Sequence, residues 1–115
     1  MPRAGVDEVR LTAEEREGIL GAAVRACHET SVSWRRIILF GSRARPEARG
    51  GDIDLLLEIL PTTDANLRRL VQRWRFALED ELGEQKFDLV LDDGLQKNPF
   101  IELARANGVE LWIND

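Results

Sequence analysis

Two apolar runs on either side of a tight turn constrain the fold of this chain more than any other feature. The first run, Ile37–Phe40, stops at Gly41, and the second, Ile53–Ile59, begins directly after Asp52. Four consecutive apolar residues that end at a glycine are typical of a buried strand that stops abruptly. In the second run both alternating faces are largely apolar, which predicts an interior strand covered on both sides.

The turn after the first run and the start of the second carry polar residues suited to phosphate and metal binding. Gly41 permits close approach of the backbone to a ligand, and the hydroxyl and free N–H groups at Ser42 suit a phosphate. Asp52 and Asp54 share one face of their strand, about 7 Å apart at the backbone for a rise of ~3.4 Å per residue. Two neighbouring carboxylates beside a phosphate site form a cradle for Mg²⁺.

The run Gly41–Arg45 (Gly-Ser-Arg-Ala-Arg), followed by Asp52–Leu55 (Asp-Ile-Asp-Leu), resembles the signature of the DNA polymerase β-type nucleotidyltransferase superfamily. It is most similar to that of the minimal nucleotidyltransferases, the small prokaryotic branch. The resemblance implies a transferase that moves a nucleoside monophosphate, AMP from ATP, to a hydroxyl group with two Mg²⁺ ions. It also implies that Gly41, Ser42 and Arg43 bind the nucleotide. Arg45 is a further candidate for phosphate contact, and both arginines could equally be surface charges.

The resemblance implies a catalytic metal triad of Asp52, Asp54 and Asp88. Asp88 lies within the apolar segment Lys86–Leu91, a third predicted strand, and an acidic residue there is costly to bury unless it is paired or liganded. The alternative for Asp88 is a strand-end residue that faces solvent. If the three carboxylates converge, they repel one another in the absence of a cation, so we expect at least one to have a raised pKa.

The rest of the chain alternates between predicted helices and strands. The resulting fold class is α/β (α+β), a nucleotidyltransferase-type mixed sheet of about four strands with helices packed mainly on one side. The predicted elements after the irregular lead-in 1–11 are a helix capped by Thr12 and ending near Cys27–Glu29, strands at 36–40 and 53–59, a helix from about Asp64 to Leu82 stopped by Gly83, the strand at 86–91, a helix capped by Asn98 with Pro99 at its first position, and a strand at 109–113.

Composition narrows the class of protein. The chain has 115 residues, 43% hydrophobic and 32% charged, with a formal net charge of −5. We therefore expect one globular domain, residues 1–115, without strong nucleic-acid binding, which needs a broadly basic surface. The single cysteine, Cys27, excludes an internal disulfide and fits a reducing compartment. No segment resembles a membrane span or a signal peptide, so we expect a cytoplasmic protein that does not enter membranes.

The resemblance also suggests a partner. Many minimal nucleotidyltransferases act as antitoxins that transfer AMP to a tyrosine of a helical HEPN-type toxin, and the lack of a visible acceptor domain here fits an acceptor presented by another protein. Two alternatives stay open, a module that neutralises its partner by contact alone and a small-molecule nucleotidyltransferase. The oligomeric state is open as well. Four arginines on the second helix are either a solvated face or a docking surface for an acidic partner or nucleotide phosphate: Arg68, Arg69, Arg73 and Arg75.

Overall fold

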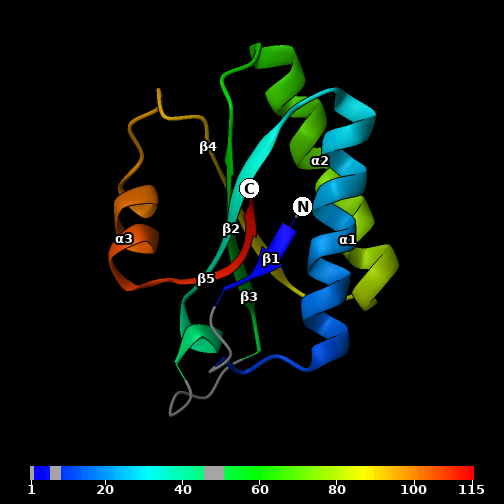
Figure 1. The fold of residues 1–115 in the computed structure, drawn as a ribbon, viewed down its shortest axis with the longest axis vertical. Helices are drawn as coiled ribbons and strands as arrows, with labels where there is room; N and C mark the ends of the chain where they lie inside the picture. The colour runs from blue at the N-terminus through cyan, green and yellow to red at the C-terminus, as the bar shows by residue number, and fades with distance from the viewer. Residues whose placement is uncertain (1, 6–8, 46–50) are drawn as a thin grey trace.

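The computed structural model describes residues 2–5, 9–45 and 51–115, which form a mixed five-stranded sheet with three α-helices (Figure 1). In chain order the elements are β1 (Pro2–Ala4), α1 (Ala13–Thr30), β2 (Trp34–Phe40), the 3₁₀ turn η1 (Ser42–Ala44), β3 (Ile53–Ile59), α2 (Asp64–Leu82), β4 (Phe87–Asp92), α3 (Pro99–Asn107) and β5 (Val109–Asn114). The mixed α/β architecture is confirmed, with five strands in place of about four.

The strand order across the sheet is β1-β5-β2-β3-β4. Strands β3 and β4 are parallel and are joined by α2 as a crossover, whereas the pairs β2–β3, β2–β5 and β1–β5 are antiparallel. Strand β3 therefore lies inside the sheet between β2 and β4, as its apolar run predicted. The end of β2 and the starts of β3 and β4 meet at one end of the sheet, which is the lower end in Figure 1.

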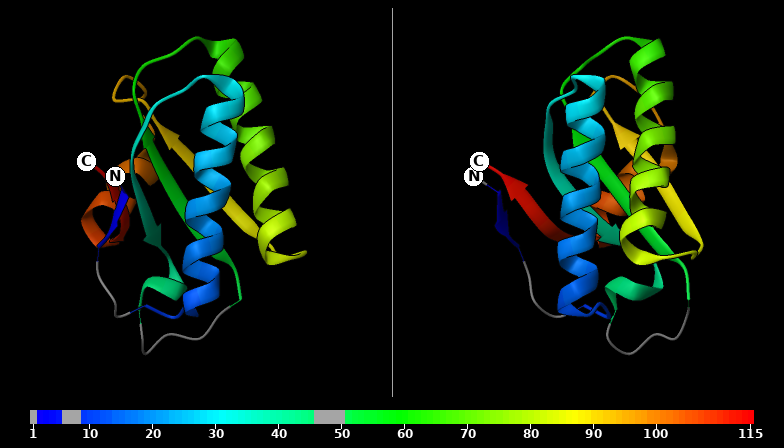
Figure 2. Two further views of the ribbon diagram at one scale, coloured as in Figure 1. Left: turned by 45° about the vertical axis from the view of Figure 1, so that its right-hand side comes forward. Right: turned by 90° about the vertical axis from the view of Figure 1, so that its right-hand side faces the viewer.

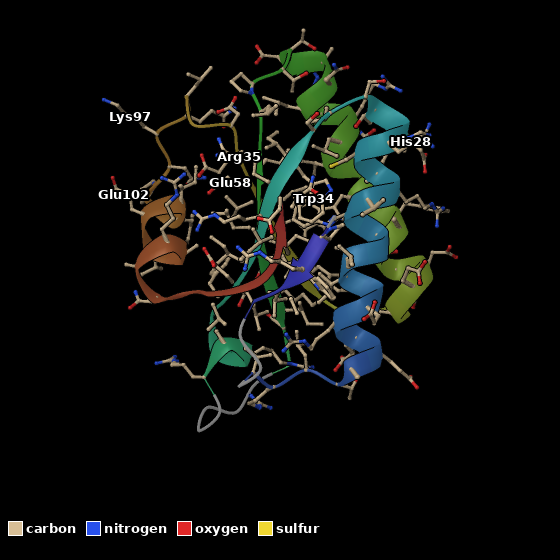
Figure 3. All side chains as sticks on the ribbon, viewed as in Figure 1. His28, Trp34, Arg35, Glu58, Lys97 and Glu102 are labelled. Carbon is tan, nitrogen blue, oxygen red and sulfur yellow. The ribbon has the colours of Figure 1, made fainter. Side chains whose placement is uncertain are left out.

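The helices cover both faces of the sheet unequally. The two long helices, α1 and α2, lie together on one face and α3 lies on the other (Figures 1 and 2). The larger core fills the space under α1 and α2 and includes alternate residues of β3, among them Leu55 and Leu57. Trp34 points into this core (Figure 3). On the opposite face a smaller core joins Leu56 to Ile101 of α3, so β3 is covered on both sides as expected.

The predicted helix starts are confirmed. Thr12 forms a reciprocal capping box with Glu15, in which the Glu15 N–H donates to Thr12 Oγ1 at 3.0 Å and the Thr12 N–H donates to Glu15 Oε1 at 2.9 Å. Thr63 caps α2 by accepting from the Asn66 N–H at 3.1 Å. Asn98 caps α3, where Pro99 occupies the first helical position.

The lead-in is not irregular throughout. Residues Pro2–Ala4 form β1, which pairs with the edge of β5 from Pro2↔Asn114 to Ala4↔Trp112, so the prediction for 1–11 was wrong there. All three residues of β1 are exposed. The strand therefore has no buried face, and its sequence does not need the alternation of apolar and polar residues by which a strand is predicted. Backbone pairing holds it in place, and a Cβ at Gly5 would lie only 2.0 Å from the Glu110 carbonyl oxygen.

An ion-pair network fastens α3 to the sheet. Arg105 of α3 pairs with Asp92, whose side chain is 2% exposed, and lies 3.5 Å from Glu58 of β3. Glu58 in turn is 2.8 Å from Arg36 of β2. Because removing one member would leave a buried carboxylate without its cation, this network holds α3 in one position over the sheet.

The described helices include none with the length and apolarity required to cross a bilayer.

Candidate functional site

The two predicted strand carboxylates Asp54 and Asp88 meet on the α3 side of the sheet. Asp54 is paired with Phe40 on the antiparallel side and with Asp88 on the parallel side. Because partners in register on neighbouring strands point to the same face, the two carboxylates stand next to each other, and the negative charge of Asp88 acts on Asp54. Asp54 is half-buried and Asp88 is exposed.

Gly41 lies directly against Asp54. Its φ is 72°, in the left-handed region that favours glycine, and a Cβ built on it would fall 1.9 Å from Asp54 Oδ2. A side chain at this position would therefore displace the carboxylate and strain the turn. The sequence predicted that Gly41 allows close approach of the backbone to a ligand, and the structure adds that it makes room for Asp54.

The site is electrostatically strained without a cation, as the sequence predicted. Burial, the hydrogen bond with Asp88 and the negative charges of Asp88 and Asp52 together raise the pKa of Asp54 from 3.8 to about 6, and burial is the largest of these causes. The nearby Lys86 ammonium partly opposes this rise. Ionising Asp54 is therefore costly unless a cation balances the added charge.

Asp52 stands beside this pair but contacts Lys86. The Lys86 Nζ lies 3.7 Å from Asp52 Oδ2, and both side chains are well exposed, so the ion pair contributes little stability. Within the described ranges, no three histidine, cysteine or acidic side chains are grouped in a way that would hold a metal ion. The adjacent Asp54 and Asp88 nevertheless fit Mg²⁺, which commonly uses one or two protein carboxylates together with phosphate oxygens.

These carboxylates line a cleft of about 930 Å³ between the sheet and α3. This volume lies within the range of small-molecule and cofactor sites. Its lining combines two acidic residues, two arginines, two asparagines and several apolar side chains: Phe40, Gly41, Arg45, Asp54, Arg75, Asp88, Leu89, Val90, Asn98, Phe100, Leu103 and Asn107. Carboxylates, cations and an apolar wall in one cleft suit a ligand that has both a charged and an apolar end.

The two arginines after Ser42 have different surroundings. Arg43 turns away from the cleft lining and donates to the carbonyl oxygens of Arg10 and Gly51, each at 3.1 Å, and lies 3.6 Å from Glu15. Arg45 is exposed and lines the cleft. Ser42 begins the 3₁₀ turn and is not part of the cleft lining. The structure thus brings Gly41 and Arg45 to the carboxylates and uses Arg43 to hold the turn.

The four α2 arginines do not act as one surface. Arg73 lies 3.2 Å from Glu29 of α1, on the helical face of the molecule. Arg75 instead donates to the Phe87 carbonyl at 3.1 Å, at the start of the edge strand β4, and lines the cleft near Asp88. Arg68 and Arg69 are exposed and belong to neither set. Only the tertiary position of α2 beside β4 distinguishes Arg75 from its neighbours.

The cleft wall on α3 was not apparent from the sequence. In α3, Ile101 and Ala104 are buried, whereas Phe100 and Leu103 are exposed and line the cleft. The sequence signal that could have indicated this wall is the presence of apolar residues on two neighbouring stripes of the helix, more than one buried side requires. Cys27 is buried and His28 is exposed on α1, far from α3 (Figure 3), so neither belongs to the cleft.

Comparisons with models of known protein families and with curated proteins gave no match. A functional assignment for this chain therefore depends on the motif Gly41–Leu55 and on the residues that line the cleft.

Proposed function

We propose that this protein is a Mg²⁺-dependent nucleotidyltransferase, with a sheet arranged as in the minimal nucleotidyltransferases. The observation that carries the proposal is the adjacent carboxylate pair, Asp54 and Asp88, at a cleft that also holds the Gly41 turn and two arginines. Carboxylates that repel one another at a cleft beside cations fit a ligand that brings both a metal ion and negative charge. A Mg²⁺–nucleoside triphosphate complex is such a ligand.

The chain's own groups divide the work of binding. Asp54 and Asp88 would hold Mg²⁺, and Asp52 would join them by giving up its weak pairing with Lys86. When bound, Mg²⁺ supplies charge stabilisation to the triphosphate and activates the acceptor oxygen. Arg45 and Arg75 would bind the phosphates, since the guanidinium group matches phosphate geometry. Gly41 keeps the backbone clear of the Asp54 carboxylate.

The reaction would join an acceptor hydroxyl oxygen to the α-phosphorus of the nucleotide. The bond from that phosphorus to pyrophosphate breaks, pyrophosphate leaves, and the hydroxyl proton passes to solvent or to a cleft carboxylate. By the resemblance of Gly41–Leu55 to the minimal nucleotidyltransferases, ATP is the donor and a tyrosine of a helical HEPN-type toxin is the acceptor. This assignment makes the protein an antitoxin that works by modification.

Intact-mass spectrometry of the toxin candidate encoded by a neighbouring gene tests the proposal. The partner is incubated with this protein and each nucleoside triphosphate, with and without Mg²⁺. We expect a mass gain of one nucleotide, released pyrophosphate and loss of both with Asp54→Asn. The matched control is Glu84→Gln, which removes an exposed carboxylate from the turn between α2 and β4, outside the cleft.

Thermal unfolding gives an independent reading of the same site. At a concentration of Mg²⁺–ATP about 100 times its Kd, ligand binding should add about 2.7 kcal/mol to the free energy of unfolding. A protein that binds its partner tightly, gains no stability from Mg²⁺–ATP and transfers no nucleotide would instead be a module that neutralises by contact. Transfer to a small hydroxyl compound in place of the partner would identify a small-molecule transferase.

A further inference from the structure

The α3 side of the cleft carries an apolar stripe whose two large side chains are more than half exposed. Phe100 is 59% exposed and Leu103 is 51% exposed, whereas the adjacent Ile101 is 5% exposed and Ala104 fully buried. Residues at spacings of three and seven share one side of a helix, so Phe100, Leu103 and Asn107 form a single stripe. All three line the cleft.

The stripe leads away from the charged end of the cleft. The C-terminal end of α3 lies against β2, since a Cβ at Gly108 would be 2.5 Å from the Ile38 side chain and 3.1 Å from the Leu39 carbonyl oxygen. Leu39 is two residues before Gly41. At a rise of ~1.5 Å per residue, Phe100 is about 10 Å further along the helix than Asn107. The cleft therefore has an ionic end at the strand termini and an apolar end on α3.

We propose that the Phe100–Leu103 stripe is the nucleobase subsite of this cleft, an inference that rests on the proposed nucleotidyltransferase function. A nucleoside triphosphate separates a flat aromatic base from its charged phosphates by a sugar, which matches the separation between the two ends. Base stacking on an exposed aromatic ring tolerates any base because each has a π-face. The phosphates then lie toward Arg45, Arg75 and the carboxylates, and the base lies on the Phe100 ring.

Few neutral polar side chains are available to form hydrogen bonds with the edge of the base. In the described lining they are the amides of Asn98 and Asn107. Asn98 Oδ1 already accepts the Phe100 N–H at 2.9 Å as the helix cap, which restricts its orientation. Stacking therefore supplies most of the affinity for the base, and the variant that removes the ring removes that affinity.

Calorimetric titration of the full chain with two ligands tests this subsite. The ligands are Mg²⁺–ATP, which has a base, and Mg²⁺–tripolyphosphate, which has none. Phe100→Ala should weaken Mg²⁺–ATP binding about tenfold or more, the order of one lost stacking contact, and leave tripolyphosphate binding within about twofold. Phe100→Trp should retain ATP binding, and Leu103→Ala should weaken ATP binding by a smaller factor in the same direction.

Phe76→Ala is the matched control. Phe76 is 60% exposed, nearly the same as Phe100, but it lies on α2 outside the cleft lining with the Arg25 guanidinium 5.5 Å from its ring centre. It should change neither Kd. Because Phe100 is exposed, Phe100→Ala should keep the wild-type melting temperature, and that measurement is made first.

Three outcomes overturn the subsite. Equal loss of both ligands with Phe100→Ala would mean that the ring supports the phosphate end. Unchanged ATP binding together with reduced transfer to the protein partner would make the stripe a docking surface and leave the nucleotidyltransferase function standing. Failure of the wild type to bind either ligand would remove the proposed function and the subsite together, a result distinct from the other two.

Discussion

Asp54→Asn is expected to stabilise the ligand-free protein at neutral and alkaline pH and to do so less in acid. In the fold, ionised Asp54 must tolerate burial and the neighbouring charges of Asp88 and Asp52. An asparagine at this position carries no charge at any pH, and its side-chain N–H can still donate to Asp88. A functional carboxylate is thus predicted to be held at the expense of stability.

The raised pKa of Asp54 determines how the free energy of unfolding changes with pH. Asp54 titrates near 3.8 when unfolded and at about 6 in the fold. Between these values the folded state keeps a proton that the unfolded state has released, so the free energy of unfolding falls as pH rises. The contribution of the protonated carboxyl is complete below about pH 4 and is lost as pH rises through about 6.

The pKa rise of Asp54 sets an upper limit on the change in the free energy of unfolding. A rise from 3.8 to about 6 corresponds to at most about 3 kcal/mol. Asp54 is only half-buried, and solvent screening reduces the effect to on the order of 1–2 kcal/mol. For a domain of this size, about 1 kcal/mol corresponds to a change of roughly 3–6 °C in Tm.

Urea unfolding at about pH 4 and about pH 8 measures the effect, with the wild type, Asp54→Asn and Glu84→Gln compared at each pH. Asp54→Asn should gain about 1–2 kcal/mol more over wild type at the higher pH than at the lower. Glu84→Gln should show no comparable difference between the two conditions. A constant difference between Asp54→Asn and wild type at both pH values would refute the argument that Asp88 and burial raise the Asp54 pKa.

Two further pairs of substitutions each compare a cleft residue with a matched residue outside the cleft. Gly41→Ala and Gly83→Ala both place a side chain at a positive φ, 72° and 81°, so each should lower the free energy of unfolding in urea by about 1–3 kcal/mol. Only the Cβ of Gly41→Ala meets Asp54 Oδ2, so only this variant should lose Mg²⁺–ATP binding in calorimetry. Similar ATP affinity in both variants would show that Asp54 is not part of the site. Arg75→Gln should weaken tripolyphosphate binding several-fold and reduce its salt dependence, whereas Arg69→Gln should not. If Arg75→Gln and Arg69→Gln weaken tripolyphosphate binding equally, the loss comes from the net charge of α2 and not from a contact of Arg75 with phosphate.

Local patterns in the sequence were sufficient to predict the elements that build the site. The apolar runs at 37–40 and 53–59 became β2 and β3 because a strand buried on both faces needs apolar side chains in both directions. Thr12 and Asn98 could be identified as helix caps because a cap forms within three residues of the chain. Local sequence patterns placed Asp54 and Asp88 in strands, but their grouping came from the family resemblance, and the structure pairs them in register on neighbouring parallel strands.

Tertiary structure decided the features that depend on which surfaces meet. Strand β1 has no pattern of its own and exists because the β5 edge offers backbone partners. Arg45 and Arg75 line the cleft while Arg43 and Arg73 do not, although each pair lies two residues apart, because only their surroundings differ. Likewise, Phe100 and Ile101 are both apolar residues of α3, and the docking of that helix on β2 and β3 buries one and leaves the other open to the cleft. Sequence periodicity reports the composition of each face, but the face that a neighbouring element covers is set by long-range packing.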